Sequence, residues 1–177
     1  MVRRGMAEQE REGEYMIDRP NRDKASSKTT RAIVVLILLV SIVLIAIVTI
    51  GGWSKLESAK FLQIAYILIY LIMAFYTARW NRGVLPMAAA LAIILGIFAA
   101  VAGPAWFDRD KGGYGQPGSI FGGDGLSEGM LGLITLIIVP VQVLLIAFSM
   151  QGFRQAWNVE VEVPAEKAGP HATPVVA

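Results

Sequence analysis

The chain has 177 residues, of which 55% are hydrophobic, and a formal net charge of +2. A soluble domain is typically about 45–50% apolar, and the excess here is concentrated in four blocks that are almost free of charge. The absence of cysteine excludes disulfides, thiolate catalysis and cysteine metal sites. The small net charge gives no reason to expect a nucleic-acid partner.

The four apolar blocks predict four transmembrane helices. At 1.5 Å per residue, about 20 residues cross the hydrocarbon core of a bilayer, which is roughly 30 Å thick. Backbone amides in lipid have to be satisfied within the segment, which selects helices over strands. We therefore expect an all-α, integral membrane four-helix bundle whose main partner is the lipid bilayer. The spans cover about residues 32–50, 60–78, 85–103 and 129–151.

The remaining sequence divides into two polar tails around the transmembrane domain 32–157. The tail 1–31 is partly basic, and we expect it to be disordered apart from a short helix near 7–15, with Thr29 or Thr30 as the N-cap of the first span. Val159–Val163 alternates like a strand, but no other segment is a convincing partner for it. The tail 158–177 is therefore predicted to be extended and disordered.

Lysine and arginine near the span ends predict the threading. A cluster of them precedes the first span, the tight connection 78–84 carries Arg79 and Arg82, and Arg154 and Lys167 follow the fourth span. The connection 51–60 and the much longer loop 103–129 carry only two each. Both termini should therefore face the cytoplasm, and the glycine-rich loop 103–129 should be external. The short tails and compact connections favour a bacterial plasma membrane.

All four tryptophans follow span ends, where indole favours the membrane interface. Trp53 and Trp106 belong to the predicted external side, and Trp80 and Trp157 to the predicted cytoplasmic side.

The third span carries small residues along one face, which lets another helix approach closely. Two partners for this face remain open: a neighbouring helix of the same bundle, which we favour, or a second membrane protein or second copy of the chain. The residues are Ala88, Ala92, Gly96, Ala99 and Gly103.

Polar side chains form one stripe on the second span and another on the fourth. Because these stripes would be costly against lipid, we expect them to face each other inside the bundle. They could act as hydrogen-bonding contacts between helices, which we favour, or could line a pocket for a lipid head or a quinone carbonyl, or a narrow permeation path. The residues are Gln63, Tyr66, Tyr70, Thr77, Thr135, Gln142 and Ser149.

The loop 103–129 has a structural interpretation. Gly103 and Pro104 should end the third helix, and Ser127 with Glu128 should open the fourth as a cap and a favourable acid. A calcium loop is excluded because Gly112 and Ser119 occupy positions that need ligands. We expect a connector in which Ile120 and Phe121 cover the bundle mouth, although a partner-binding loop remains open.

Between their end residues the spans carry no Asp, Glu, Lys, Arg or His, and the single histidine, His171, lies in the C-terminal tail. An ionisable residue inside the membrane is the usual mark of a proton relay, an ion path or a catalytic centre. We therefore predict no catalytic residue, no cofactor and no metal site. The expected function is that of a non-catalytic accessory subunit or small scaffold. The alternative is a small channel or carrier, or a lipid- or quinone-binding protein that uses the polar faces of the second and fourth spans.

Overall fold

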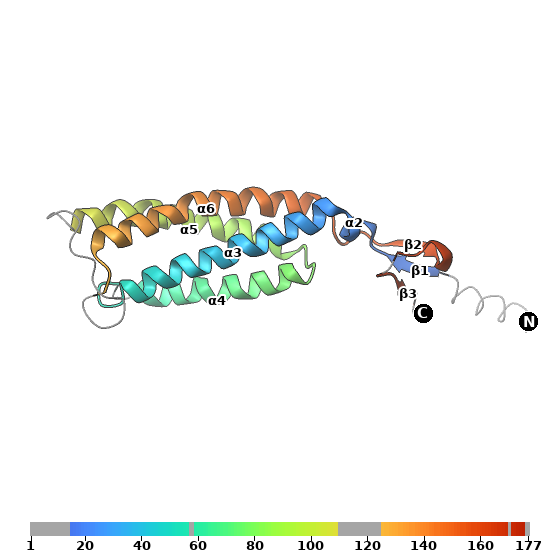
Figure 1. Cartoon of the computed structure of the whole chain (residues 1–177), viewed down its shortest axis with the longest axis horizontal. Coiled ribbons are helices and arrows are strands. Elements are labelled where there is room, and N and C mark those ends of the chain that lie inside the picture. The colour runs from blue at the N-terminus through green and yellow to red at the C-terminus, as the bar shows by residue number, and fades with distance from the viewer. Residues whose placement is uncertain (1–14, 57–58, 110–124, 170, 176–177) are drawn as a thin grey trace, which may run out of the picture.

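The computed structural model describes residues 15–56, 59–109, 125–169 and 171–175. Within them, four long helices run side by side (Figure 1). Each of the four is long and apolar enough to cross a membrane, which confirms the predicted all-α bundle of four spans. The helices are α3 (Ala25–Gly51), α4 (Ala59–Ala78), α5 (Val84–Arg109) and α6 (Glu128–Arg154).

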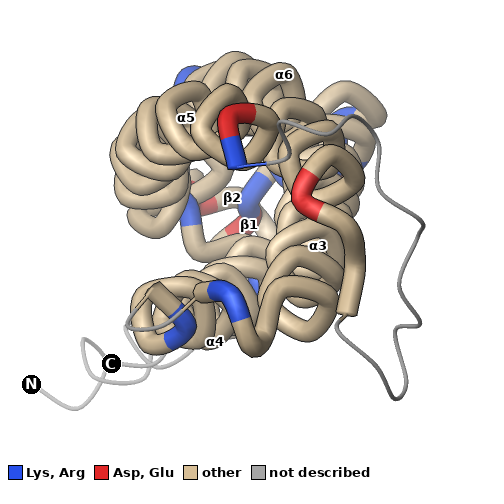
Figure 2. The backbone as a smooth tube through the Cα atoms, turned by 90° about the vertical axis from the view of Figure 1, so that its left-hand side faces the viewer, with Lys and Arg blue, Asp and Glu red and all other residues tan. Residues whose placement is uncertain are grey.

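The packing of the helices is uneven around the bundle. α5 lies along α6, and α3 lies against both α4 and α6, whereas α4 makes only slight contact with α5. Figure 2 looks along the bundle, with α5 beside α6 in the upper part of the view and α4 beside α3 in the lower part. The side chains that point out of the bundle are largely apolar, as contact with lipid requires; they include Leu36, Val43, Phe61, Ile72, Ile97, Val101 and Val143.

Two helix ends differ from the prediction. α3 begins at Ala25 with Lys24 as its N-cap, so neither Thr29 nor Thr30 caps it. The extra turns form because their inward face has a partner: Thr30 is buried, and its hydroxyl accepts a hydrogen bond from Gln155 Nε2 over 2.9 Å. α5 does not end at Pro104 but continues to Arg109.

The tails form a small sheet, which contradicts the prediction of a disordered C-terminal tail without a strand partner. Strand β1 (Tyr15–Asp18) pairs antiparallel with β2 (Val161–Pro164) and with β3 (Thr173–Pro174), in the order β2-β1-β3. The short helices α2 (Pro20–Asp23) and η1 (Ala165–Lys167) complete this region. An even number of spans returns the chain to the end where it started, which brings the two tails together. The predicted helix near residues 7–15 lies almost entirely outside the described residues.

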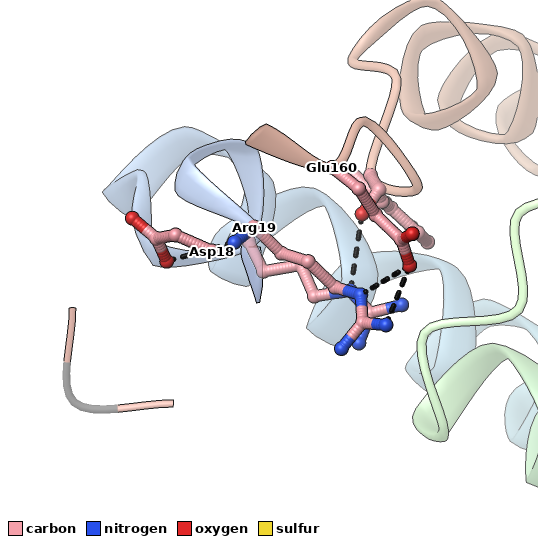
Figure 3. Close-up of polar contacts among 5 residues, drawn as sticks. Asp18, Arg19 and Glu160 are labelled. Carbon is pink, nitrogen blue, oxygen red and sulfur yellow. Dashed lines mark hydrogen bonds and ion pairs between the residues drawn. The ribbon is translucent and has the colours of Figure 1, made fainter. Parts of the chain in front are cut away.

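An ion pair links the two tails beside this sheet (Figure 3). Arg19 Nε donates to Glu160 Oε1 over 3.0 Å, and the Arg19 backbone N–H donates to Asp18 Oδ1 over 2.7 Å. Arg22 donates to the backbone oxygen of Trp157 over 3.0 Å. Burial, and to a lesser degree the neighbouring charge of Arg19, lowers the pKa of Arg22 from its ordinary value, but an arginine stays protonated at neutral pH.

The bundle therefore has two different ends. We call the end that carries the sheet of the tails and the connection 78–84 the tail end. The opposite end, where residues 51–59 and 109–128 connect the helices, is the loop end. The glycine-rich segment 110–124, including Ile120 and Phe121, lies outside the described residues.

Candidate functional site

The polar residues predicted on the second and fourth spans meet near the middle of the bundle. The Tyr70 hydroxyl donates to Gln142 Oε1 over 2.9 Å. Gln142 Nε2 then donates to Ser41 Oγ over 3.0 Å, and the Ser41 hydroxyl donates to the Ile37 backbone oxygen over 2.8 Å. All three polar side chains are almost completely buried. The second and fourth spans were predicted to turn their polar stripes toward each other, and Tyr70 and Gln142 do so. Ser41 of α3 extends this hydrogen-bonded group.

The other predicted site residues are distributed along the bundle. Nearer the loop end, the Thr49 hydroxyl donates to Gln63 Oε1 over 2.6 Å, and the Thr135 hydroxyl donates to the Leu131 backbone oxygen over 2.7 Å. Nearer the tail end, Thr77 and Ser149 are fully buried, and their hydroxyls have no hydrogen-bond partner among the described residues. The seven residues therefore do not form one common pocket.

The small-residue face of α5 packs against α6 of the same chain. Ala88, Ala92 and Ala99 are buried, and the closest approach lies at Gly103. A Cβ placed on Gly132 of α6 would lie 3.1 Å from the Gly103 backbone oxygen and 2.9 Å from the Phe107 ring. This contact also explains why α5 continues past Pro104, since the added turns hold Phe107 against α6.

The tail end of the bundle is closed by aromatic and polar contacts. Trp157 is completely buried, its ring lies edge-to-face with Trp80 at a centroid distance of 5.4 Å, and its Nε1–H donates to Gln155 Oε1 over 2.9 Å. Two arginines bond to carbonyls where helices end: Arg31 to Ala78 over 2.9 Å, and Arg82 to Phe153 over 2.6 Å. Trp157 therefore belongs to the protein interior and not, as predicted, to the interface with lipid.

The loop end, in contrast, contains a cavity of about 280 Å³. Its apolar walls come from all four helices, and its exposed lining side chains lie on α4 and α5, the two helices in slight contact. The lining lies toward the loop end of the bundle and reaches the middle of α5 at Leu95. Three of the predicted polar residues, Gln63, Tyr66 and Thr135, belong to the lining. The apolar part includes Ile45, Val48, Leu62, Leu95, Phe98, Ala99, Ala102 and Ile138.

Two cationic side chains lie where the cavity meets the loop end. Lys55 Nζ donates to the Leu126 backbone oxygen over 3.0 Å and forms an ion pair with Glu128 Oε1 at 3.1 Å. The Arg109 guanidinium lies over the ring of Trp106, 5.1 Å from its centroid. Trp106 is buried, which corrects its predicted interfacial position. Lys55, Trp106 and Arg109 were predicted to lie in connections between the spans. Their spacing in the sequence does not show that they come together at one cavity.

The entrance to α6 is held in place beside them. Ser127 caps the helix as predicted, accepting a hydrogen bond from the Met130 backbone N–H over 3.3 Å, and Glu128 lies in the first turn. The Leu126 backbone N–H donates to the Gly51 oxygen over 2.8 Å, which ties the start of α6 to the end of α3. Lys55 and Glu128 therefore have defined positions at the cavity.

The fold and the apolar outward faces define the chain as a multi-pass membrane protein. Comparison with known proteins gives no significant match to a protein-family model, a curated protein or a solved structure. Any more specific function has to be argued from the geometry of the bundle.

Proposed function

We propose that this chain is a non-catalytic, multi-pass membrane protein that binds a small amphipathic molecule in the cavity at the loop end. The observation that carries the proposal is the cavity itself: apolar side chains from four helices line it, and polar and charged groups lie at one end. Ligand pockets have this composition, with a largely apolar lining and a few polar groups that orient the ligand. The volume of about 280 Å³ lies close to the lower limit for small-ligand sites, roughly 300 Å³.

The same geometry supports binding over permeation. The lining extends no further toward the tail end than Tyr66 and Leu95. Beyond it lie the hydrogen-bonded Tyr70 and Gln142, and then the buried Trp157. A channel or carrier would have to break these contacts to move a solute through, whereas a ligand can enter the cavity from the side of α4 and α5 with the contacts intact.

The accessory-subunit role stays a prediction, and the geometry supports it less directly. Two of the surfaces foreseen for a partner, the small-residue face of α5 and the polar stripes, are occupied within the chain by α6 and by hydrogen bonds. The third, the loop 103–129, lies largely outside the described residues. Among the described residues, a partner would have to bind at the apolar outer faces or at the tail end.

Native mass spectrometry of the protein, gently extracted from its own membranes, tests the proposal. We expect one small molecule to be retained per chain. Ala102→Phe, which places a large ring in the cavity from an exposed position on α5, should reduce its occupancy severalfold. Ala100→Phe is the matched control, because Ala100 is exposed on the same helix and does not line the cavity. Bare monomer would overturn the proposal, and a retained polypeptide in place of a small molecule would favour the accessory role.

We also propose that the protein lies in a bacterial plasma membrane with the tail end in the cytoplasm. Support comes from the basic residues, of which the described part of the chain places three near the loop end: Lys55, Lys60 and Arg109. The tail end carries Arg19, Arg22, Lys24, Lys28, Arg31, Arg79, Arg82, Arg154 and Lys167.

The lack of native cysteine makes this orientation easy to test. In intact cells, a membrane-impermeant thiol reagent should label Ser54→Cys at the loop end and leave Glu166→Cys at the tail end unlabelled until the membrane is opened. Both positions are exposed in the protein. The reverse labelling pattern would show that the chain is threaded the other way.

A further inference from the structure

The charge at the cavity points to the class of its ligand. Among the described residues that line the cavity, the two charged side chains, Lys55 and Arg109, are both cations. They lie at the loop end of the lining, while the opposite part consists of Ile45, Leu95 and Ile138 together with the ring of Tyr66. The cavity thus has a cationic end and an apolar end, as the binding site of an amphiphile with a negative head group requires.

The side-chain oxygens of the uncharged polar residues in the lining already have partners within the protein. Gln63 Oε1 accepts from Thr49, and the Thr135 hydroxyl donates to the Leu131 carbonyl. The Tyr66 hydroxyl donates to the Leu91 backbone oxygen over 3.5 Å. Lys55 also has partners, the Leu126 carbonyl and Glu128, but the two cations are the groups that an anionic head group favours, because a charge-assisted hydrogen bond is about twice as strong as a neutral one.

The volume limits how much of a lipid the cavity can hold. About 280 Å³ is close to the smallest ligand pockets, and it is too small for a head group together with two acyl chains. One acyl chain can lie along Phe98 and Ala102 on α5, with part of it outside among the bilayer lipids. A ligand with one chain fits both the volume and the side on which the cavity opens.

We propose that the ligand is a single-chain anionic amphiphile, such as a long-chain fatty acid, whose carboxylate lies between Lys55 and Arg109 and whose chain fills the apolar part of the cavity. This inference rests on the proposed function, because it names the ligand class of the same cavity. It also assigns a role to Glu128. Because Glu128 pairs with Lys55 at 3.1 Å, it competes with the ligand head for that cation.

Fluorescence quenching in nanodiscs of phosphatidylcholine tests the inference, because Trp106 lines the cavity. The probes are a brominated long-chain fatty acid, used at alkaline pH so that it is ionised, and the brominated monoacylglycerol of the same chain. The signal is the quenching of Trp106 fluorescence, obtained as the difference in quenching between the unchanged protein and Trp106→Phe. The fatty acid should bind about tenfold more tightly than the neutral probe, in line with one charge-assisted hydrogen bond.

Three variants make the assignment specific. Arg109→Gln should abolish most of the preference for the anionic probe. Lys60→Gln is the matched control: it removes the same charge from the same end, but Lys60 lies over Trp53 and does not line the cavity. Glu128→Gln should strengthen fatty-acid binding severalfold, because it releases Lys55 and removes a negative charge. A merely structural Lys55–Glu128 pair would not give this gain.

The possible failures are distinguishable. Equal binding of both probes, unaffected by Arg109→Gln, would overturn the anionic assignment and leave ligand binding in the cavity intact. Displacement of the fatty acid by the two-chain lipid phosphatidylglycerol at equal concentration would overturn the single-chain assignment. Absence of Trp106 quenching by either probe, with no effect of Ala102→Phe, would overturn the proposed function as well.

Discussion

Trp157→Ala should be the most destabilising single substitution at the tail end, with a loss of about 3–5 kcal/mol in the free energy of unfolding. Trp157 is 0% exposed although it lies beyond Arg154, the last residue of α6. Its ring packs edge-to-face on Trp80 and lies against Gly152, where a Cβ would approach the ring to 3.1 Å. The substitution leaves a large cavity and removes the partner of Gln155 Oε1.

The effect should spread to the tails, because the backbone around Trp157 holds the N-terminal segment. Arg22 bonds to the Trp157 carbonyl, Asn21 Nδ2 donates to the Ala156 carbonyl over 3.1 Å, and β2 begins four residues later. We therefore expect Trp157→Ala to increase proteolysis within the first 25 residues as well as to lower the thermal midpoint.

Trp53→Ala is the matched control, since it removes the same side chain at the other end of the bundle. Trp53 is 53% exposed, and its ring lies under Lys60, whose Nζ is 4.9 Å from the ring centroid. Its loss should change the free energy of unfolding by less than about 1 kcal/mol. Thermal unfolding of both variants in nanodiscs measures the difference. Equal midpoints would mean that Trp157 is an interfacial residue in lipid, as its sequence position suggested.

The four spans were predictable because each is a long apolar run, and a single segment in lipid can satisfy its own backbone groups only as a helix. The positions at which the helices begin and end could not be predicted, because they depend on tertiary contacts. The first turns of α3 are polar, and they become helical where Thr30 meets Gln155, a residue distant in the sequence. The strand-like alternation of Val159–Val163 was visible in the sequence, but its partner β1 has only four residues and could not be recognised alone.

The candidate site was predictable in part for a similar reason. Helical periodicity placed Tyr70 and Gln142 on inward faces, and they bond to each other. Helical periodicity did not show that the helices pack closely around Tyr70 and Gln142. Nor did it show that they leave a cavity nearer the loop end. The cations of that space, Lys55 and Arg109, flank connections in the sequence, so their convergence depends on how the helices are arranged.

We expect Gly132→Ala to destabilise the protein by about 1–3 kcal/mol. The sign of the change shows whether the steric cost between α5 and α6 outweighs the gain in helix propensity. In an isolated helix the change would be favourable, because alanine is the better helix former by roughly 1 kcal/mol. Here the added methyl group would meet the Phe107 ring at 2.9 Å and the Gly103 backbone oxygen at 3.1 Å. The ring can turn away, but the carbonyl belongs to α5, so the two helices have to move apart.

Gly96→Ala provides the matched control on the facing helix. A methyl group there would meet its nearest neighbour, Gln142 Cβ, at 3.6 Å, which is an ordinary van der Waals contact. We expect Gly96→Ala to leave the thermal midpoint unchanged or to raise it, while Gly132→Ala lowers it. Both glycines lie at the α5–α6 contact, so opposite signs would locate the tight approach near Gly103 and Gly132. If both substitutions stabilised the protein, α5 and α6 would not pack as closely in the bilayer as they do in this structure.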